Sequence, residues 1–170
     1  MNIHKSFVVL SMTVLSQSFL CAEQISNDWL EDGSASWTTK SAPGASVSAS
    51  VITEDGQNVL QVVVADVASE SGASGDVRVY RSFGGVEADQ SYTIRFQAKA
   101  EEPGKAIVFI HPQDAPQQVL LRKDITVNQD WSDFTIKFTV KNASSLCVLG
   151  FAGIGKSNNT FTFREIVLEH

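Results

Sequence analysis

Apolar and polar residues alternate along most of the chain, and the alternation is clearest over residues 76–100. Alternate positions there are largely apolar in each of two runs: Val77, Val79 and Phe83, then Tyr92, Ile94, Phe96 and Ala98. The positions between them carry polar or mixed side chains: Arg78, Tyr80 and Ser82, then Arg95, Gln97 and Lys99. A period of two is typical of a strand with one face in a core and the other in water. The stretch therefore predicts a hairpin of two strands joined by a short glycine-bearing turn, with the polar side chains clustered on one face.

Similar strand patterns recur through the rest of the chain. The further candidates are residues 47–51, 59–67, 106–110, 119–127, 134–140, 146–151 and 160–168. After the first 22 residues, no window shows the i, i+3, i+4 apolar stripe of a helix. Parallel strands need crossover connections, usually helices, so a βαβ fold is excluded. We predict an all-β domain of roughly nine or ten strands, folded as a two-sheet antiparallel β-sandwich of the jelly-roll kind.

The first 22 residues have the pattern of a secretory signal. Lys5 gives a basic start, and the apolar run Phe7–Leu15 is too short to cross a membrane as a stable anchor. We therefore expect residues 1–22 to be a signal peptide and residues 23–170 to be one domain, secreted or periplasmic.

The two cysteines bear on export and on stability. A lipoprotein signal with Cys21 as the first mature residue is an alternative, although it prefers a small residue where this chain has Leu20. If Cys21 leaves with the signal, Cys147 is the only cysteine left and no disulfide can form within the chain. Cys147 lies in an apolar run, and we predict that it is a small core residue.

The charge of the chain excludes two classes of partner. It has 13 Lys and Arg against 19 Asp and Glu, and loss of residues 1–22 would remove Lys5 and no acid. No cluster of basic residues occurs along it. Nucleic acids and anionic membrane surfaces are recognised by concentrated Lys and Arg, so we expect neither as a partner, and no membrane insertion after signal cleavage.

The polar face of residues 76–100 carries side chains that suit a sugar. Sugar sites stack an aromatic ring on the C–H face of the ligand and bond its hydroxyls with planar polar groups. The candidate ligand-binding residues are Tyr80 as the stacking ring, then Arg78, Arg95 and Gln97, with Phe109 and His111 from the next strand. Three alternatives stay open: Tyr80 packed against a loop, Phe109 in the core, and ordinary surface positions for the polar residues.

Four segments, in this order, resemble a known family. They are Asn27–Trp37 (NDWLEDGSASW), Ser91–Ala100 (SYTIRFQAKA), Trp131 with the alternating Phe134, Ile136, Phe138 and Val140, and Phe161–Leu168 (FTFREIVL). They are similar to segments of the jelly-roll carbohydrate-binding modules attached to bacterial cellulases and xylanases. That group includes families four, nine and twenty-two and has a galactose-binding-domain-like fold.

The resemblance implies a module that binds polysaccharide or oligosaccharide on one sheet face without catalysis. It also implies structural roles for Trp37 and Trp131. Many such modules carry an additional aromatic residue in the loop that corresponds to residues 68–75, and this chain has none there. A soluble oligosaccharide in a groove therefore fits better than crystalline cellulose.

The closing segment departs from the family. An acidic residue there often helps the opening Glu to hold a structural calcium ion, whereas this chain has Arg164. A guanidinium group cannot ligate calcium. We therefore expect no cofactor, with calcium either absent or shifted to Glu165, and Arg164 paired with Glu31 or Asp32 in its place.

Other function classes have weaker support. The acidic residues fall mostly in turns, whereas glycoside hydrolysis needs two positioned carboxylates, and His111 alone cannot make a His-based zinc site. Gly150–Ser157 (GFAGIGKS) has the spacing of a phosphate-binding loop, but a strand pattern follows where that loop needs a helix. We predict that the chain is no enzyme. A structural or protein-binding jelly roll, and an accessory domain of a glycoside-hydrolase system, are the alternatives.

Overall fold

The computed structural model describes residues 24–26, 29–66, 77–154 and 158–170. The predicted signal peptide and the loop of residues 68–75 lie outside these described residues. The strands are β1 (Gln24–Ser26), β2 (Thr38–Lys40), β3 (Ser46–Glu54), β4 (Gln57–Asp66), β5 (Arg78–Val86), β6 (Ser91–Ala100), β7 (Gly104–Pro112), β8 (Leu121–Val127), β9 (Ser132–Thr139), β10 (Ser144–Ala152) and β11 (Asn159–Glu169). The one helical element within those ranges is a 3-10 turn, η1 (Ser34–Ser36). In the described ranges, no helix has the length and apolarity needed to cross a membrane.

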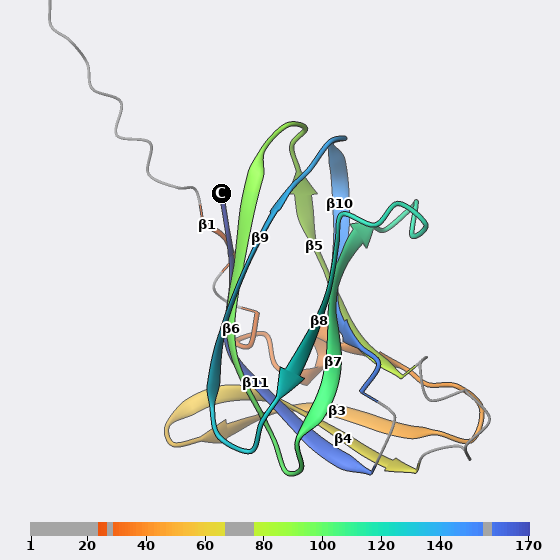
Figure 1. Ribbon diagram of the computed structural model, residues 1–170, viewed down its shortest axis with the longest axis vertical. Coiled ribbons are helices and arrows are strands. Elements are labelled where there is room, and N and C mark those ends of the chain that lie inside the picture. Colours follow the sequence, from red (N-terminus) through yellow and green to blue (C-terminus); the bar gives the residue numbers. More distant parts are fainter. Residues whose placement is uncertain (1–23, 27–28, 67–76, 155–157) are drawn as a thin grey trace, which may run out of the picture.

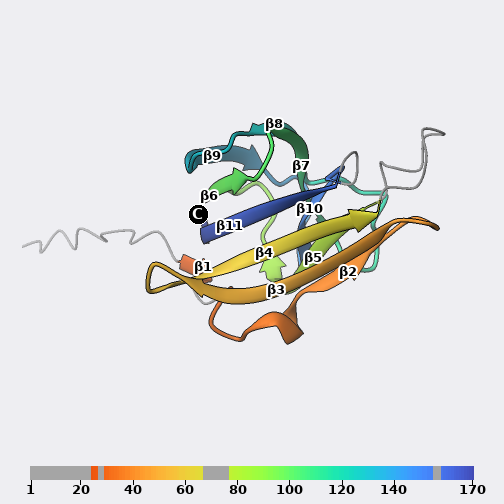
Figure 2. The same ribbon diagram turned by 90° about the horizontal axis from the view of Figure 1, so that it is seen from below.

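The strands form two antiparallel sheets that pack face to face (Figure 1). The first sheet has the order β3-β4-β11-β6-β9, with β1 paired to β11, and the second has the order β2-β5-β10-β7-β8. Figure 2 shows β3, β4 and β11 lying side by side in the first sheet. The predicted all-β, two-sheet antiparallel sandwich is confirmed. The two shortest strands, β1 and β2, are additions, because three residues are too few to show a period of two.

The core lies between the sheets and is built from the inward faces of the central strands. Phe151 of β10 stacks on Phe163 of β11, with ring centroids 3.9 Å apart, and meets the ring of Phe96 of β6 edge-on at 5.3 Å. These three rings tie the middle of one sheet to the middle of the other. Cys147 is fully buried on the same face of β10 as Phe151, and burial raises the pKa of its thiol. Its predicted place in the core is confirmed.

The predicted hairpin over residues 76–100 is wrong. β5 pairs with β2 and β10, whereas β6 pairs with β11 and β9 in the other sheet. The connection crosses between the sheets: the backbone N–H of Asp89 donates to the carbonyl of Val140, and the N–H of Val140 donates to the carbonyl of Gln90. Val140 directly follows β9, so these bonds hold the turn against the sheet that contains β6. Alternation has the same form in strands that pair and in strands that cross over, so it could not distinguish the two.

Residues 150–157 have the spacing of a phosphate-binding loop, but the secondary structure around them differs from the strand and helix that phosphate binding needs. β10 contains its first residues, and β11 begins at Asn159, so the expected strand is confirmed where a helix would be required. Residues 155–157 lie outside the described ranges.

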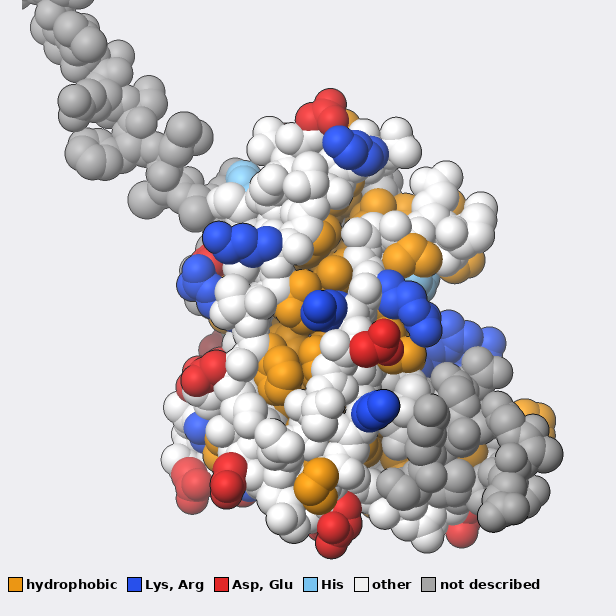
Figure 3. All heavy atoms as spheres, viewed as in Figure 1, with side chains coloured by type: hydrophobic (Ala, Val, Ile, Leu, Met, Phe, Trp, Pro, Cys, Tyr) orange, Lys and Arg blue, Asp and Glu red, His pale blue; other side chains and the backbone are white. Residues whose placement is uncertain are grey.

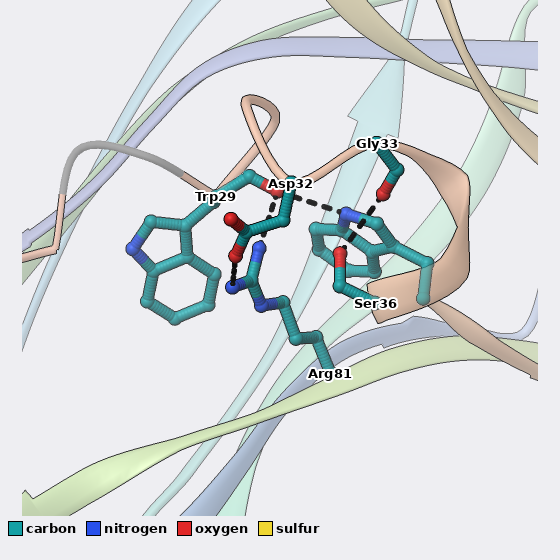
Figure 4. Close-up of polar contacts among 6 residues, drawn as sticks. Trp29, Asp32, Gly33, Ser36 and Arg81 are labelled. Atoms are coloured by element: carbon teal, nitrogen blue, oxygen red, sulfur yellow. Dashed lines mark hydrogen bonds and ion pairs between the residues drawn. The ribbon is translucent and has the colours of Figure 1, made fainter.

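Arg81 of β5 binds the segment before β2 and so joins that segment to the second sheet (Figure 4). Its Nη1 donates to the carbonyl of Trp29 at 2.7 Å, and its Nη2 lies 2.5 Å from Oδ2 of Asp32. The indole Nε1 of Trp37 donates to the same Trp29 carbonyl at 3.1 Å. Arg81 shares the inward face of β5 with Phe83, whose ring lies 5.4 Å from that of Trp29. One guanidinium group therefore fixes a carbonyl and a carboxylate of a segment that has little regular structure.

We expect Arg81→Ala to lower the free energy of unfolding by about 2 kcal/mol, because a charged donor to a partly buried carbonyl is lost. Urea denaturation measures the change. Arg95→Ala is the matched control, since the Arg95–Glu169 pair has 57% of the arginine side chain exposed against 17% for Arg81. An exposed pair contributes about 0–1 kcal/mol. Equal losses in the two variants would contradict the anchoring role of Arg81.

Candidate functional site

A cleft of about 330 Å³ lies on the face of the second sheet that points away from the core. Its lining residues are Lys40, Arg78, Tyr80, Ser82, Phe109, His111, Gln113, Pro116 and Val148. We call it the β5–β7 cleft, after the strands that form its two walls. Four of the six predicted site residues line it together: Arg78, Tyr80, Phe109 and His111.

Two residues of the lining, Tyr80 and Phe109, belong to one row across three neighbouring strands. Gly150 of β10 pairs with Tyr80 of β5 on one side and with Phe109 of β7 on the other. Gly150 has no side chain, and an added Cβ would lie 2.5 Å from the ring of Phe109 and 2.7 Å from Cβ of Tyr80. The absent side chain therefore leaves room for the Phe109 ring to lie over Gly150, close to Tyr80. Phe109 is half-buried on the outward face, so its placement in the core is excluded.

The next row places polar groups beside the rings. Val148 of β10 pairs with Ser82 and with His111. The His111 ring stacks on that of Phe109, with centroids 5.6 Å apart and planes at 8°. Its Nδ1 lies 2.7 Å from the carbonyl of Pro112. A carbonyl can only accept, so Nδ1 carries the hydrogen, and Nε2 of the neutral ring is left as an acceptor.

The loop after β7 closes this end of the cleft. The hydroxyl of Ser82 donates to Oε1 of Gln113 at 2.7 Å, which orients the Gln113 amide over the cleft wall. The backbone N–H of Gln113 donates to the carbonyl of Leu146 at the start of β10. Strands β5, β7 and β10 therefore all contribute to the position of this amide.

The structure does not bring Arg95 and Gln97 to this cleft, so their predicted place beside Tyr80 is wrong. Both lie on β6 in the other sheet, a consequence of the crossover after β5. Arg95 pairs with Glu169 at 2.7 Å. Gln97 donates to Asp133 at 2.8 Å and accepts from Nε of Arg164 at 2.6 Å. Their polar groups are used in bonds within the protein.

A second cavity, of about 430 Å³, lies over the first sheet, and its lining favours a structural interpretation. None of the described residues that line it is aromatic, and two of its charged residues, Lys99 and Glu54, are paired at 2.5 Å. The nearby Trp131 ring is covered by Arg164, whose Cζ lies 4.0 Å from the ring centroid, and by Lys99 at 4.8 Å. A ring covered by two cations fits the structural role expected of Trp131. Its larger volume alone does not make this cavity the better site.

The residues present do not fit the calcium site that the resemblance implies. Arg164 is bonded to Gln97 and lies on Trp131, so its predicted pairing with Glu31 or Asp32 is wrong. Asp32 pairs with Arg81 instead. Within the described part of the chain, no three His, Cys, Asp or Glu residues are placed to hold a metal ion. The expectation that the protein needs no cofactor stays a prediction.

Sequence reasoning missed two features of the cleft. Lys40 lies on β2, which is too short to show a pattern. Val148, which lines the cleft, and Gly150, over which the Phe109 ring lies, are in the continuous apolar run of β10. A signal was present there: a sandwich strand that is apolar on both faces must be covered on its outer face too, and a glycine inside a strand often marks close approach of another group.

Comparisons with known proteins agree with this fold. The model of a family described as a carbohydrate binding domain matches residues 22–158. No curated protein matches the chain. Among solved structures, one described as CBM4 is 22% identical, with coverage of 86% of this chain and 94% of its own and a TM-score of 0.65.

Two further solved structures resemble the chain at lower identity. The N-terminal cellulose-binding domain of β-1,4-glucanase C from Cellulomonas fimi is 18% identical, covers 78% of this chain and 93% of its own, and has a TM-score of 0.57. A xylan-binding domain from Paenibacillus barcinonensis is 14% identical, covers 78% of this chain and 84% of its own, and has a TM-score of 0.53. These likenesses show the shared β-sandwich fold, and the family match spans most of the sequence: the chain belongs to the carbohydrate binding domain family.

Proposed function

We propose that the protein binds a short stretch of polysaccharide, or an oligosaccharide, in the β5–β7 cleft and does so without catalysis. The observation that carries the proposal is the row Tyr80–Gly150–Phe109, in which the absent glycine side chain brings the Phe109 ring close to Tyr80 in the lining of the cleft. A sugar ring has apolar C–H faces and a polar hydroxyl rim. Rings in the cleft offer the apolar contact, and polar groups beside them offer the hydrogen bonds.

The polar residues of the lining suit hydroxyl groups. Arg78 offers donors only, the Gln113 amide offers both donors and an acceptor, and His111 offers its second ring nitrogen, Nε2. The similar domains named for cellulose and xylan binding support a β-linked polysaccharide as the ligand.

A binding role without catalysis is supported by the lining of the cleft. Counting only residues that the structure describes, the lining contains no Asp or Glu, whereas glycoside hydrolysis needs two carboxylates beside the scissile bond. The signal-like pattern of the first 22 residues supports export, so the proposed ligand is one met outside the cytoplasm.

Affinity electrophoresis against β-glucan, xylan, mannan and alginate tests the proposal. We expect retardation on at least one of them. Tyr80→Ala is expected to weaken binding to that polysaccharide about tenfold or more, because a half-buried stacking surface is lost at the centre of the contact. The melting temperature should fall by only a few degrees, because Tyr80 lies outside the core.

Arg95→Ala is the matched control for this experiment, because it removes a polar side chain from the other sheet and should leave retardation unchanged. Loss of retardation in Arg95→Ala with full retardation in Tyr80→Ala would mean that the ligand binds the first sheet, and it would contradict the proposal. No retardation on any polysaccharide would favour a jelly roll that binds protein or has a structural role.

A further inference from the structure

The charge of the β5–β7 cleft is opposite in sign to that of the chain. The chain carries 13 basic and 19 acidic residues, yet among the described residues the lining of the cleft contains Lys40 and Arg78 and no carboxylate. On the right-hand side of the molecule, where β7 and β10 lie, Figure 3 shows Lys and Arg side chains gathered beside a histidine. A cleft with walls of low dielectric constant concentrates the field of such charges.

The two fully charged residues of the lining have no acidic partner in the described ranges. The three ion pairs found there use Arg81, Arg95 and Lys99. Arg78 also has a buried donor without a partner. Its Nε is shielded from water and has no hydrogen-bond acceptor in the described part of the protein. A shielded donor without an acceptor is costly, and any acceptor that reaches the guanidinium group is favoured.

Lys40 and Arg78 lie next to each other at one end of the cleft. They are register partners on β2 and β5, and Tyr80 follows Arg78 on the same face of β5. Across the sheet, Arg122 of β8 is the register partner of Phe109 and adds a further cation at the far rim. Two exposed acidic residues lie at this side: Asp124 is the register partner of Ile107, and Asp114 lies in the loop between the lining residues Gln113 and Pro116. The end formed by Lys40 and Arg78 is therefore positive, and an aromatic ring lies beside it.

We propose that the ligand of the cleft is an acidic glycan, a chain that contains uronate residues. A sugar carboxylate lies against Arg78 and Lys40, and the C–H face of the sugar ring lies against Tyr80 and Phe109. This inference rests on the proposed carbohydrate binding and names its substrate class. A carboxylate suits Arg78 because the guanidinium fork offers two parallel donors to two planar oxygens. A neutral sugar gives neither cation a counter-charge.

Isothermal titration calorimetry with matched ligands tests the charge. The probes are an oligomannuronate, which is a β-linked uronate chain, and the same oligosaccharide with its carboxylates methyl-esterified, together with a neutral β-glucan and a xylan oligosaccharide. We expect the acid to bind at least about tenfold more tightly than its ester, because one charge-assisted hydrogen bond is enough to produce a difference of that size. Added salt should narrow that difference.

Arg78→Gln tests the residue, with Arg95→Gln as the matched control on the other sheet. We expect Arg78→Gln to weaken binding of the acid about tenfold or more and to weaken binding of the ester by a clearly smaller factor, so that the preference for the acid over the ester falls. Arg95→Gln should leave both affinities unchanged. Lys40→Gln should act in the same direction as Arg78→Gln, with a smaller effect, because a flexible ammonium group lacks the planar fork.

The outcomes separate this inference from the proposed function. Binding of the ester or of a neutral glucan as tight as binding of the acid, and sensitive to Tyr80→Ala, would overturn the acidic class alone. Equal binding of polyglutamate would mean attraction between charges without sugar recognition and would overturn it too. No binding of any glycan would overturn both proposals.

Discussion

Replacing Gly150 with alanine is expected to abolish carbohydrate binding. The added Cβ would lie 2.5 Å from the Phe109 ring, 2.7 Å from Cβ of Tyr80 and 2.5 Å from the carbonyl oxygen of Val79. The ring can turn, but the Val79 carbonyl belongs to the neighbouring strand, so β5 or β10 must also shift. Both walls of the cleft then move, and the site loses the geometry that stacking requires.

The expected affinity loss for Gly150→Ala is about a hundredfold, since one methyl group displaces both proposed stacking rings. The free energy of unfolding should fall by about 1–3 kcal/mol, the usual cost of overpacking. Calorimetry with the best-bound glycan and urea denaturation measure the two effects. Gly84→Ala is the matched control, because a Cβ on that β5 glycine meets no atom within 4 Å. Unchanged affinity in Gly150→Ala would rule out a binding role for the row.

The sequence predicted much of the local geometry of the cleft walls. A period of two indicated the outward direction of Arg78 and Tyr80, because the direction of a side chain depends only on its place in its own strand. The apolar positions between them gave the inward faces in the same way. For Phe109 the pattern left both the outward face and the core open, and the fold decides for the outward face. The overall class followed from strand patterns with no helices between them.

The arrangement of strands between the sheets could not be predicted in this way. Arg95 and Gln97 occupy polar positions in an alternating pattern like that of Arg78 and Tyr80. They nevertheless lie in the other sheet, because the chain crosses between the sheets at residues 87–90. The bonds that fix this crossover join it to Val140, about fifty residues further along. The choice of partner for Asp32 was equally non-local: Arg81 and Arg164 have the same chemistry, and only the fold places Arg81 beside it.

Replacing Phe151 with alanine is expected to give the largest loss of stability. The Phe151 side chain is fully buried. Its ring stacks on that of Phe163, with centroids 3.9 Å apart, and meets the Phe96 ring edge-on, with centroids 5.3 Å apart. Its removal leaves a cavity between the central strands of both sheets, at a cost of about 3–5 kcal/mol. A domain of this size is stabilised by about 5–15 kcal/mol in total, so the melting temperature should fall by about 10 °C or more.

Phe134→Ala is the matched control for Phe151→Ala. The Phe134 ring stacks on that of Phe96, with centroids 5.0 Å apart. Phe134 is only half-buried and lies on the edge strand β9, so its loss should lower the free energy of unfolding less than the loss of Phe151. Phe151 and Gly150 are neighbours in β10 that point to opposite faces. Phe151→Ala should therefore keep its glycan affinity at a temperature where it is still folded, whereas Gly150→Ala should lose affinity while still folded. If Phe151→Ala lost affinity in proportion to stability, the cleft and the core would be one cooperative unit, and the separate roles of the two faces of β10 would be wrong.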